Sequence, residues 1–115
     1  MNFVPDAEAR VWLRDFVPDS DNFDRDAGNR TKNEKHDVRG EEIESIFYQE
    51  KIIFAGRISE PVHDEWRGLI LGRSIEGRLL ALIFTRRGDR LRPISCRPMR
   101  SGERRVYEAG IQEHS

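Results

Sequence analysis

The stretch that decides the fold is WRGLILGRSIEGRLLALIFTRRGDRLRPISCR, residues 66–97. Three runs rich in aliphatic residues, at 66–73, 78–85 and 90–97, are separated by the short turns SIEG and RRGD. Glycine-containing turns between strand-like runs predict hairpins, and the second turn carries Gly88. The stretch therefore predicts three consecutive antiparallel strands.

The last of these strands is predicted to be irregular. Pro93 has no N–H to give to a sheet, so it favours an edge position or a bulge. If the alternation of side chains were regular, Arg90 and Arg92 would share a face with Ile94 and Cys96. That face is expected to begin polar and to end buried.

The flanking sequence adds a strand and helices. KIIFAG at 51–56 is a further strand candidate, and Phe23 is expected to close a short strand. Helices are expected within 23–38, over 39–49 and from near Ser101. The order β-α-α-β-β-β-α predicts an α+β domain, an antiparallel sheet of about four strands with helices packed on it.

The first 22 residues are predicted to form an extension with a short amphipathic helix, which Asp6 can cap. One apolar stripe is expected on this helix, made of Ala9, Trp12, Leu13 and Phe16. The stripe must cover either this domain or a partner. The expected organisation is an extension, one domain and a short tail, over residues 1–22, 23–110 and 111–115.

Composition excludes several classes of protein. The chain has 115 residues and a single cysteine, Cys96, so it cannot form an internal disulfide. We expect a cytoplasmic protein, because no signal peptide is recognisable and no apolar run approaches the roughly 18 residues of a membrane span. His36, His63 and His114 lie far apart in the sequence, which predicts no metal site, and no cofactor motif is present.

The charge is divided between the two halves of the chain. The net charge is −1, yet residues 67–105 carry 11 arginines against three acidic residues. A basic segment behind an acidic one suggests a polyanionic partner, and arginine is suited to forked contacts with phosphate. The alternative is a solvated face that keeps the domain soluble.

The order of several motifs resembles the BrnT family, the toxin halves of bacterial type II toxin–antitoxin pairs. The motifs are FDRDAGNRTKNEKHDV, EEIESIF, LGRSIEGRLLALIFTRRGDRLRPISCRPM and ERRVYE, within residues 23–108. The resemblance implies a RelE-like ribonuclease fold and an activity that cuts RNA and halts translation. It also implies a BrnA-type ribbon-helix-helix antitoxin as partner, with operator DNA bound by the complex.

RNA cleavage by attack of the 2′-hydroxyl needs a base, cations around the phosphorus and an acid, but no metal. His36 is a candidate for proton transfer, with Lys35 beside it. The alternative is that these cations only stabilise the negative end of a helix dipole. Strand-end arginines can converge on a phosphate, or form surface ion pairs typically worth about 0–1 kcal/mol. The predicted catalytic residues are Lys35, His36, Arg67, Arg86 and Arg97. The predicted RNA-binding residues are Arg73, Arg87, Arg90 and Arg92.

Two other interpretations stay open. The family usually has tryptophan where this chain has Arg25, and glycine where it has Asp37. These departures favour, a little, a non-catalytic module that pairs with its antitoxin and helps to repress transcription. The third interpretation is a soluble α+β domain whose arginines only solvate it. His63 is expected in an exposed loop, and Trp66 is expected to pack in the core rather than to stack on a base.

Overall fold

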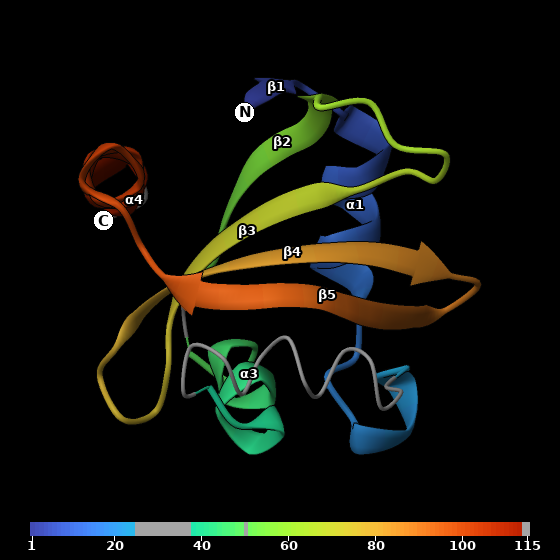
Figure 1. Ribbon diagram of the computed structural model, residues 1–115. Helices are drawn as coiled ribbons and strands as arrows, with labels where there is room; N and C mark the ends of the chain where they lie inside the picture. The colour runs from blue at the N-terminus through green and yellow to red at the C-terminus, as the bar shows by residue number, and fades with distance from the viewer. Residues whose placement is uncertain (25–37, 50, 114–115) are drawn as a thin grey trace.

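The computed structural model describes residues 1–24, 38–49 and 51–113, and it contains one five-stranded antiparallel sheet in the order β1-β2-β3-β4-β5 (Figure 1). The strands are β1 (Asn2–Val4), β2 (Ile53–Glu60), β3 (Gly68–Arg73), β4 (Leu79–Arg87) and β5 (Arg90–Pro98). The described helices are α1 (Ala7–Asp15), the 3₁₀ turn η1 (Ser20–Asn22), α3 (Gly40–Ile46) and α4 (Ser101–Glu113). The α+β class is confirmed.

The sheet has one strand more than the predicted four. The additional strand is β1, which pairs antiparallel with β2 at the edge of the sheet. Phe23, predicted to close a short strand, forms only an isolated parallel bridge with Leu91. Most of the helix predicted within 23–38 lies outside the described residues.

The predicted meander is confirmed, and its turns depend on glycine. Gly77 (φ 89°) joins β3 to β4 and Gly88 (φ 64°) joins β4 to β5, in a backbone region that other residues rarely adopt. Trp66 packs in the core between the rings of Phe54 and Phe84, as expected.

The irregularity predicted at Pro93 is also present. β5 is an edge strand, and its register shifts where Ile83 faces Ser95 but Phe84 faces Pro93. One extra residue, Ile94, therefore interrupts the alternation. The expectation that Arg92 and Cys96 share a face is wrong for this reason: Cys96 lies in the core opposite Leu82, whereas Arg92 lies opposite Thr85.

Two cores flank the sheet. On one face, α1 and α3 cover a cluster that includes Ile70, Leu82 and Phe84. On the other face, α4 covers one end through Tyr107, which packs with Leu71. Figure 1 shows α1 behind the sheet and α4 at one end of it, which leaves β4 and β5 facing the viewer.

The N-terminal helix packs against this domain. The Asp6 side chain accepts a hydrogen bond from the Ala9 N–H (3.0 Å) and another from Trp66 Nε1 (2.8 Å). Trp12 stacks on Phe16, with ring centroids 5.2 Å apart, and both lie against the core. The apolar stripe of α1 therefore covers this domain rather than a partner. No helix among the described residues is long and apolar enough to cross a membrane.

Candidate nucleic-acid interface

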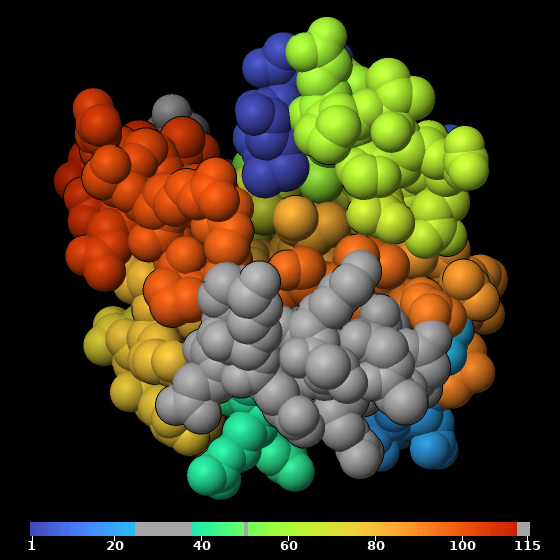
Figure 2. Space-filling model, viewed as in Figure 1, coloured from blue at the N-terminus to red at the C-terminus, as the bar shows by residue number. Residues whose placement is uncertain are grey.

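The face of the sheet opposite α1 carries most of the predicted RNA-binding arginines. Arg92 faces Thr85 across β4 and β5, and Arg87 faces Arg90 at the end of the same hairpin. Arg67 comes two residues before Leu69, which belongs to the core cluster on this face. Figure 2 shows this side of the molecule, with atoms of β4 and β5 between α4 and the loop that follows β2.

Three guanidinium groups meet around two carboxylates at one end of this face. Glu65 lies 3.9 Å from Arg67 and 3.9 Å from Arg87. Asp24 lies 4.0 Å from Arg87 and 3.8 Å from Arg92. We call Arg67, Arg87 and Arg92, with Glu65 and Asp24, the arginine cluster. Its three cations come from the residue before β3, the end of β4 and β5.

The pairing within the arginine cluster is loose. All four nitrogen–oxygen separations are 3.8–4.0 Å, longer than the 2.7–2.9 Å of a charge-assisted hydrogen bond. Arg87 is half-exposed, and the buried Nε of Arg67 has no hydrogen-bond partner among the described residues. Arg67 and Arg87 therefore have donor capacity left for an anionic ligand.

A pocket opens beside Arg67. It has a volume of about 480 Å³ and is lined by Val62, His63, Asp64, Glu65 and Arg67. His63 is half-buried rather than fully exposed as the sequence suggested, because the loop turns toward the sheet before Trp66 enters the core. An imidazole thus lies in the same pocket as a guanidinium of the arginine cluster.

Arg97 has a different environment at the other end of the face. Its guanidinium donates two hydrogen bonds to Glu103 of α4, at 2.7 and 2.8 Å, and these raise the pKa of Arg97. Burial raises the pKa of Glu103, but the hydrogen bonds from Arg97 and the Arg100 N–H outweigh it and lower that pKa. Arg97 therefore fixes the start of α4 to β5.

Arg86 lies on the opposite face. Its guanidinium carbon is 4.4 Å from the ring centroid of Trp66 and 5.7 Å from that of Trp12, and Glu8 lies 3.6 Å away. Alternation along β4 directs Arg86 toward α1 and its neighbour Arg87 away from it. The structure therefore gives Arg86 a packing role under α1.

Convergence of the strand-end arginines on one phosphate, expected for Arg67, Arg73, Arg86 and Arg97, does not hold. Arg73 faces Leu79 and Arg97 faces Ala81, six or more residues along β4 from Arg87, roughly 20 Å at strand spacing. Arg73 is exposed at the end of β3. Arg90 is exposed at the hairpin end, where its Nε donates to the Asp21 carbonyl (3.2 Å). Lys35 and His36 lie outside the described residues, as do Arg25 and Asp37.

The two carboxylates of the arginine cluster were not predicted from the sequence. Glu65 comes two residues before Arg67, a spacing that places both side chains on one face of an extended segment. That spacing was a usable signal. Asp24 gave no such signal, because its position depends on the backbone bond from its N–H to the Leu91 carbonyl (2.8 Å). No group of three metal-ligating side chains occurs among the described residues.

Comparison with known proteins gives one match. The family model described as "Ribonuclease toxin, BrnT, of type II toxin-antitoxin system" matches residues 25–103 of this chain. No curated protein and no solved structure matches significantly. The matched span includes Glu65 and the three arginines of the cluster, whereas α1 lies before it.

Proposed function

This chain belongs to the BrnT family of ribonuclease toxins of type II toxin–antitoxin systems, and from that premise we propose that it cleaves RNA without a metal ion at the arginine cluster. The substrate is the phosphodiester backbone of single-stranded RNA. The reaction class is attack of a 2′-hydroxyl on the adjacent phosphorus. Inhibition of translation follows from cleavage of cellular RNA.

The observation that supports this proposal is the meeting of Arg67, Arg87 and Arg92 around two shared carboxylates. Carboxylate and phosphate oxygens accept the same forked hydrogen bonds from guanidinium groups. A phosphate can therefore replace Glu65 and Asp24 as the partner of these cations. The same groups then face the charge that develops on the phosphorane.

Proton transfer requires a group that titrates near neutral pH. An unperturbed histidine has a pKa of about 6.5, and His63 lines the pocket beside Arg67. In this scheme one group takes the 2′-proton and another protonates the departing 5′-oxygen. We assign His63 to one of these steps. Lys35 and His36 remain candidates for the other.

The test is cleavage of a labelled single-stranded RNA by the purified protein in EDTA. Arg87→Ala is expected to lower the cleavage rate by about 10²–10³, the cost of losing a transition-state contact. Arg104→Ala removes an exposed arginine from α4 and is the matched control, expected to keep the rate. Wild-type cleavage that requires a divalent metal, or equal loss in both variants, would refute the assignment.

His63 is tested separately. His63→Gln is expected to abolish most cleavage while leaving RNA affinity within about twofold, because a proton-transfer group contributes about 10²–10⁴ to rate rather than to binding. The variant is also expected to change the pH profile of the cleavage rate. An unchanged pH profile in His63→Gln would exclude His63 from proton transfer.

A second candidate function is a binding module that acts with a BrnA-type antitoxin on operator DNA. The pairing of Arg97 with Glu103 and the position of Arg86 under α1 favour it, because the Arg97 guanidinium is already occupied and Arg86 lies on the opposite face of the sheet. Under this alternative the wild type binds RNA but does not cut it, and repression of the operator requires both proteins. The cleavage assay and an operator-binding assay with the antitoxin distinguish the two functions.

A further inference from the structure

We propose that a groove between α1, α3 and the start of β2 is a docking site for an acidic segment of the antitoxin that also carries apolar side chains. This inference rests on the toxin–antitoxin pairing in the proposed function, and it concerns the side of the sheet away from the arginine cluster. The groove is defined by four apolar residues, Leu13, Phe16, Phe47 and Ile52, and two rim cations, Arg10 and Arg14.

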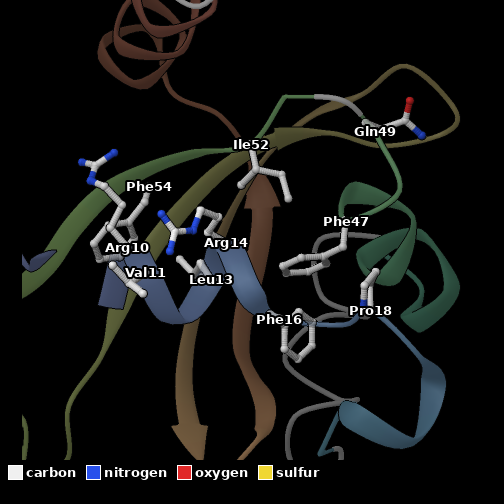
Figure 3. A pocket seen from close by; sticks show the side chains of 10 residues that line it. All are labelled: Arg10, Val11, Leu13, Arg14, Phe16, Pro18, Phe47, Gln49, Ile52 and Phe54. Carbon is white, nitrogen blue, oxygen red and sulfur yellow. The ribbon is translucent and has the colours of Figure 1, made fainter. Parts of the chain in front are cut away.

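The groove is preformed by packing between elements. Figure 3 shows Phe16, Phe47 and Ile52 projecting toward a common space from the ends of α1 and α3 and the residue before β2. The rings of Phe16 and Phe47 meet edge to face, with centroids 5.5 Å apart. The Tyr48 hydroxyl donates to the Pro18 carbonyl, which ties α3 to the segment after α1. The volume of about 540 Å³ is sufficient for side chains of a docked segment.

Exposed apolar side chains occur at Val11, which lines the groove, and at Val17 and Tyr48, which neighbour groove residues in the sequence. Val11 is 45% exposed and Val17 is 61% exposed, and Tyr48 is 64% exposed beside Phe47. An apolar patch with a charged rim is characteristic of an interaction surface. The partner therefore presents apolar side chains to the groove.

The charge of the groove's rim indicates the charge of the partner that fits it. Two arginines and no carboxylate occur among the described residues that line the groove. The Arg10 guanidinium lies over the Phe54 ring (5.9 Å to the centroid), and no described carboxylate is within ion-pair distance of it. Among the described residues Arg14 pairs with its exposed neighbour Asp15, at 3.5 Å, and pairs of that kind stabilise little. Complementarity at the rim thus favours an acidic segment.

The position of the groove distinguishes a protein partner from RNA. It lies on the α1 side of the sheet, whereas the arginine cluster lies on the opposite face, so both can be occupied together. Its α1 wall also lies before the span that matches the family, residues 25–103. The groove therefore gives this chain a recognition surface beyond the family core, suited to selecting its own antitoxin.

The first experiment measures binding of labelled peptides of about fifteen residues by fluorescence anisotropy. An amphipathic leucine–glutamate peptide is expected to bind at least about tenfold more tightly than its leucine–lysine or serine–glutamate counterparts. The double variant Arg10→Glu/Arg14→Glu is expected to abolish the preference for acid. Arg104→Glu/Arg105→Glu, on the exposed side of α4, is the matched control and is expected to keep it. No acid preference in the wild type, or equal loss in the control, would overturn the proposal.

The second experiment uses a full-length BrnA-type antitoxin. The Arg10→Glu/Arg14→Glu variant is expected to bind it at least about tenfold more weakly, with RNA cleavage unchanged, and the α4 control is expected to bind as the wild type does. Wild-type affinity in the groove variant would overturn the proposal, as would self-association of the toxin that this variant removes. A wild type that binds antitoxin through the groove but cuts no RNA would refute the proposed function alone.

Discussion

At the scale of single residues, a buried carboxylate in α3 accepts several hydrogen bonds, one of them from an arginine. Glu42 is only 4% exposed, and it accepts hydrogen bonds from Ser74 Oγ (2.8 Å) and Arg78 Nε (2.9 Å). The hydrogen bond from Arg78 lowers the pKa of Glu42 below 4.5, against the opposing effect of burial. Because the pKa falls on folding, the carboxylate stabilises the fold above the unfolded pKa, and the stabilisation is lost as pH falls through the folded pKa.

We predict that Glu42→Gln lowers the free energy of unfolding at pH 7 by about 1.5–3 kcal/mol, the typical contribution of a hydrogen bond to a charged group. The difference from the wild type is expected to shrink as pH falls from 4.5 through the lower folded pKa, because the carboxyl is protonated first in the unfolded and then in the folded wild type. Urea denaturation at several pH values measures both effects. Glu41→Gln, an exposed neighbour, is the control and is expected to change stability by less than about 0.5 kcal/mol. A difference in free energy of unfolding that does not change with pH would contradict the charge-based explanation.

At the scale of elements, α3 packs closely on β3 because β3 has no side chain at the contact. A Cβ on Gly72 would collide with Cγ2 of Ile46 in α3, whereas a Cβ on Gly102 in α4 would meet nothing within 4 Å. The same close approach places Glu42 of α3 beside Ser74, just after β3. The helix and the hairpin are therefore fixed to each other by both apolar and polar contacts.

We predict opposite results for two glycine substitutions. Gly72→Ala is expected to lower the free energy of unfolding by about 1–3 kcal/mol, since overpacking forces the helix from the sheet. Gly102→Ala is expected to raise it by about 0.5–1 kcal/mol, because alanine restricts the unfolded chain and clashes with nothing. Chemical denaturation of both variants beside the wild type is the measurement. A stable Gly72→Ala would show that α3 can shift without loss of packing.

At the scale of the whole molecule, folding converts a chain of nearly zero net charge into a particle with one basic face. The sum is −1, yet Arg67 just before β3, Arg87 of β4 and Arg92 of β5 meet around Glu65 and Asp24 at one end of that face. Arg86 lies on the opposite face of the sheet, under α1, because side chains alternate between the two faces along β4. The local potential, rather than the net charge, governs attraction of a polynucleotide.

We predict that affinity for single-stranded RNA falls with salt, with a slope of about −2 in log K against log salt if the three arginines contact phosphate, at about −0.7 for each contact. Arg87→Ala is expected to reduce the magnitude of the slope by about 0.7, while Arg104→Ala is expected to leave it unchanged. Binding isotherms at several salt concentrations give these slopes. A salt-independent affinity would exclude phosphate contacts by the cluster.

The local sequence was sufficient to predict the meander, its turn at Gly88 and the irregularity at Pro93. A turn glycine and a proline without an N–H act on the backbone within a few residues, so their effects can be read from short stretches. It was also sufficient for the family, since the ordered motifs of residues 23–108 anticipate the match over 25–103. The strand β1 was missed because three residues, Asn2–Val4, form a strand only by pairing with β2, more than fifty positions away.

By itself the sequence determined the α+β class, the order of the last three strands and the presence of a basic segment. Only the tertiary structure decided which arginines meet. One extra residue at Ile94 reverses the faces of β5, and α1 covers the side of the sheet to which Arg86 points. Arg97 is withdrawn by Glu103 of α4, and Asp24 reaches Arg92 through a backbone bond to Leu91. The positions of Arg86 and Asp24 depend on contacts between segments distant in sequence, which residue spacing does not encode.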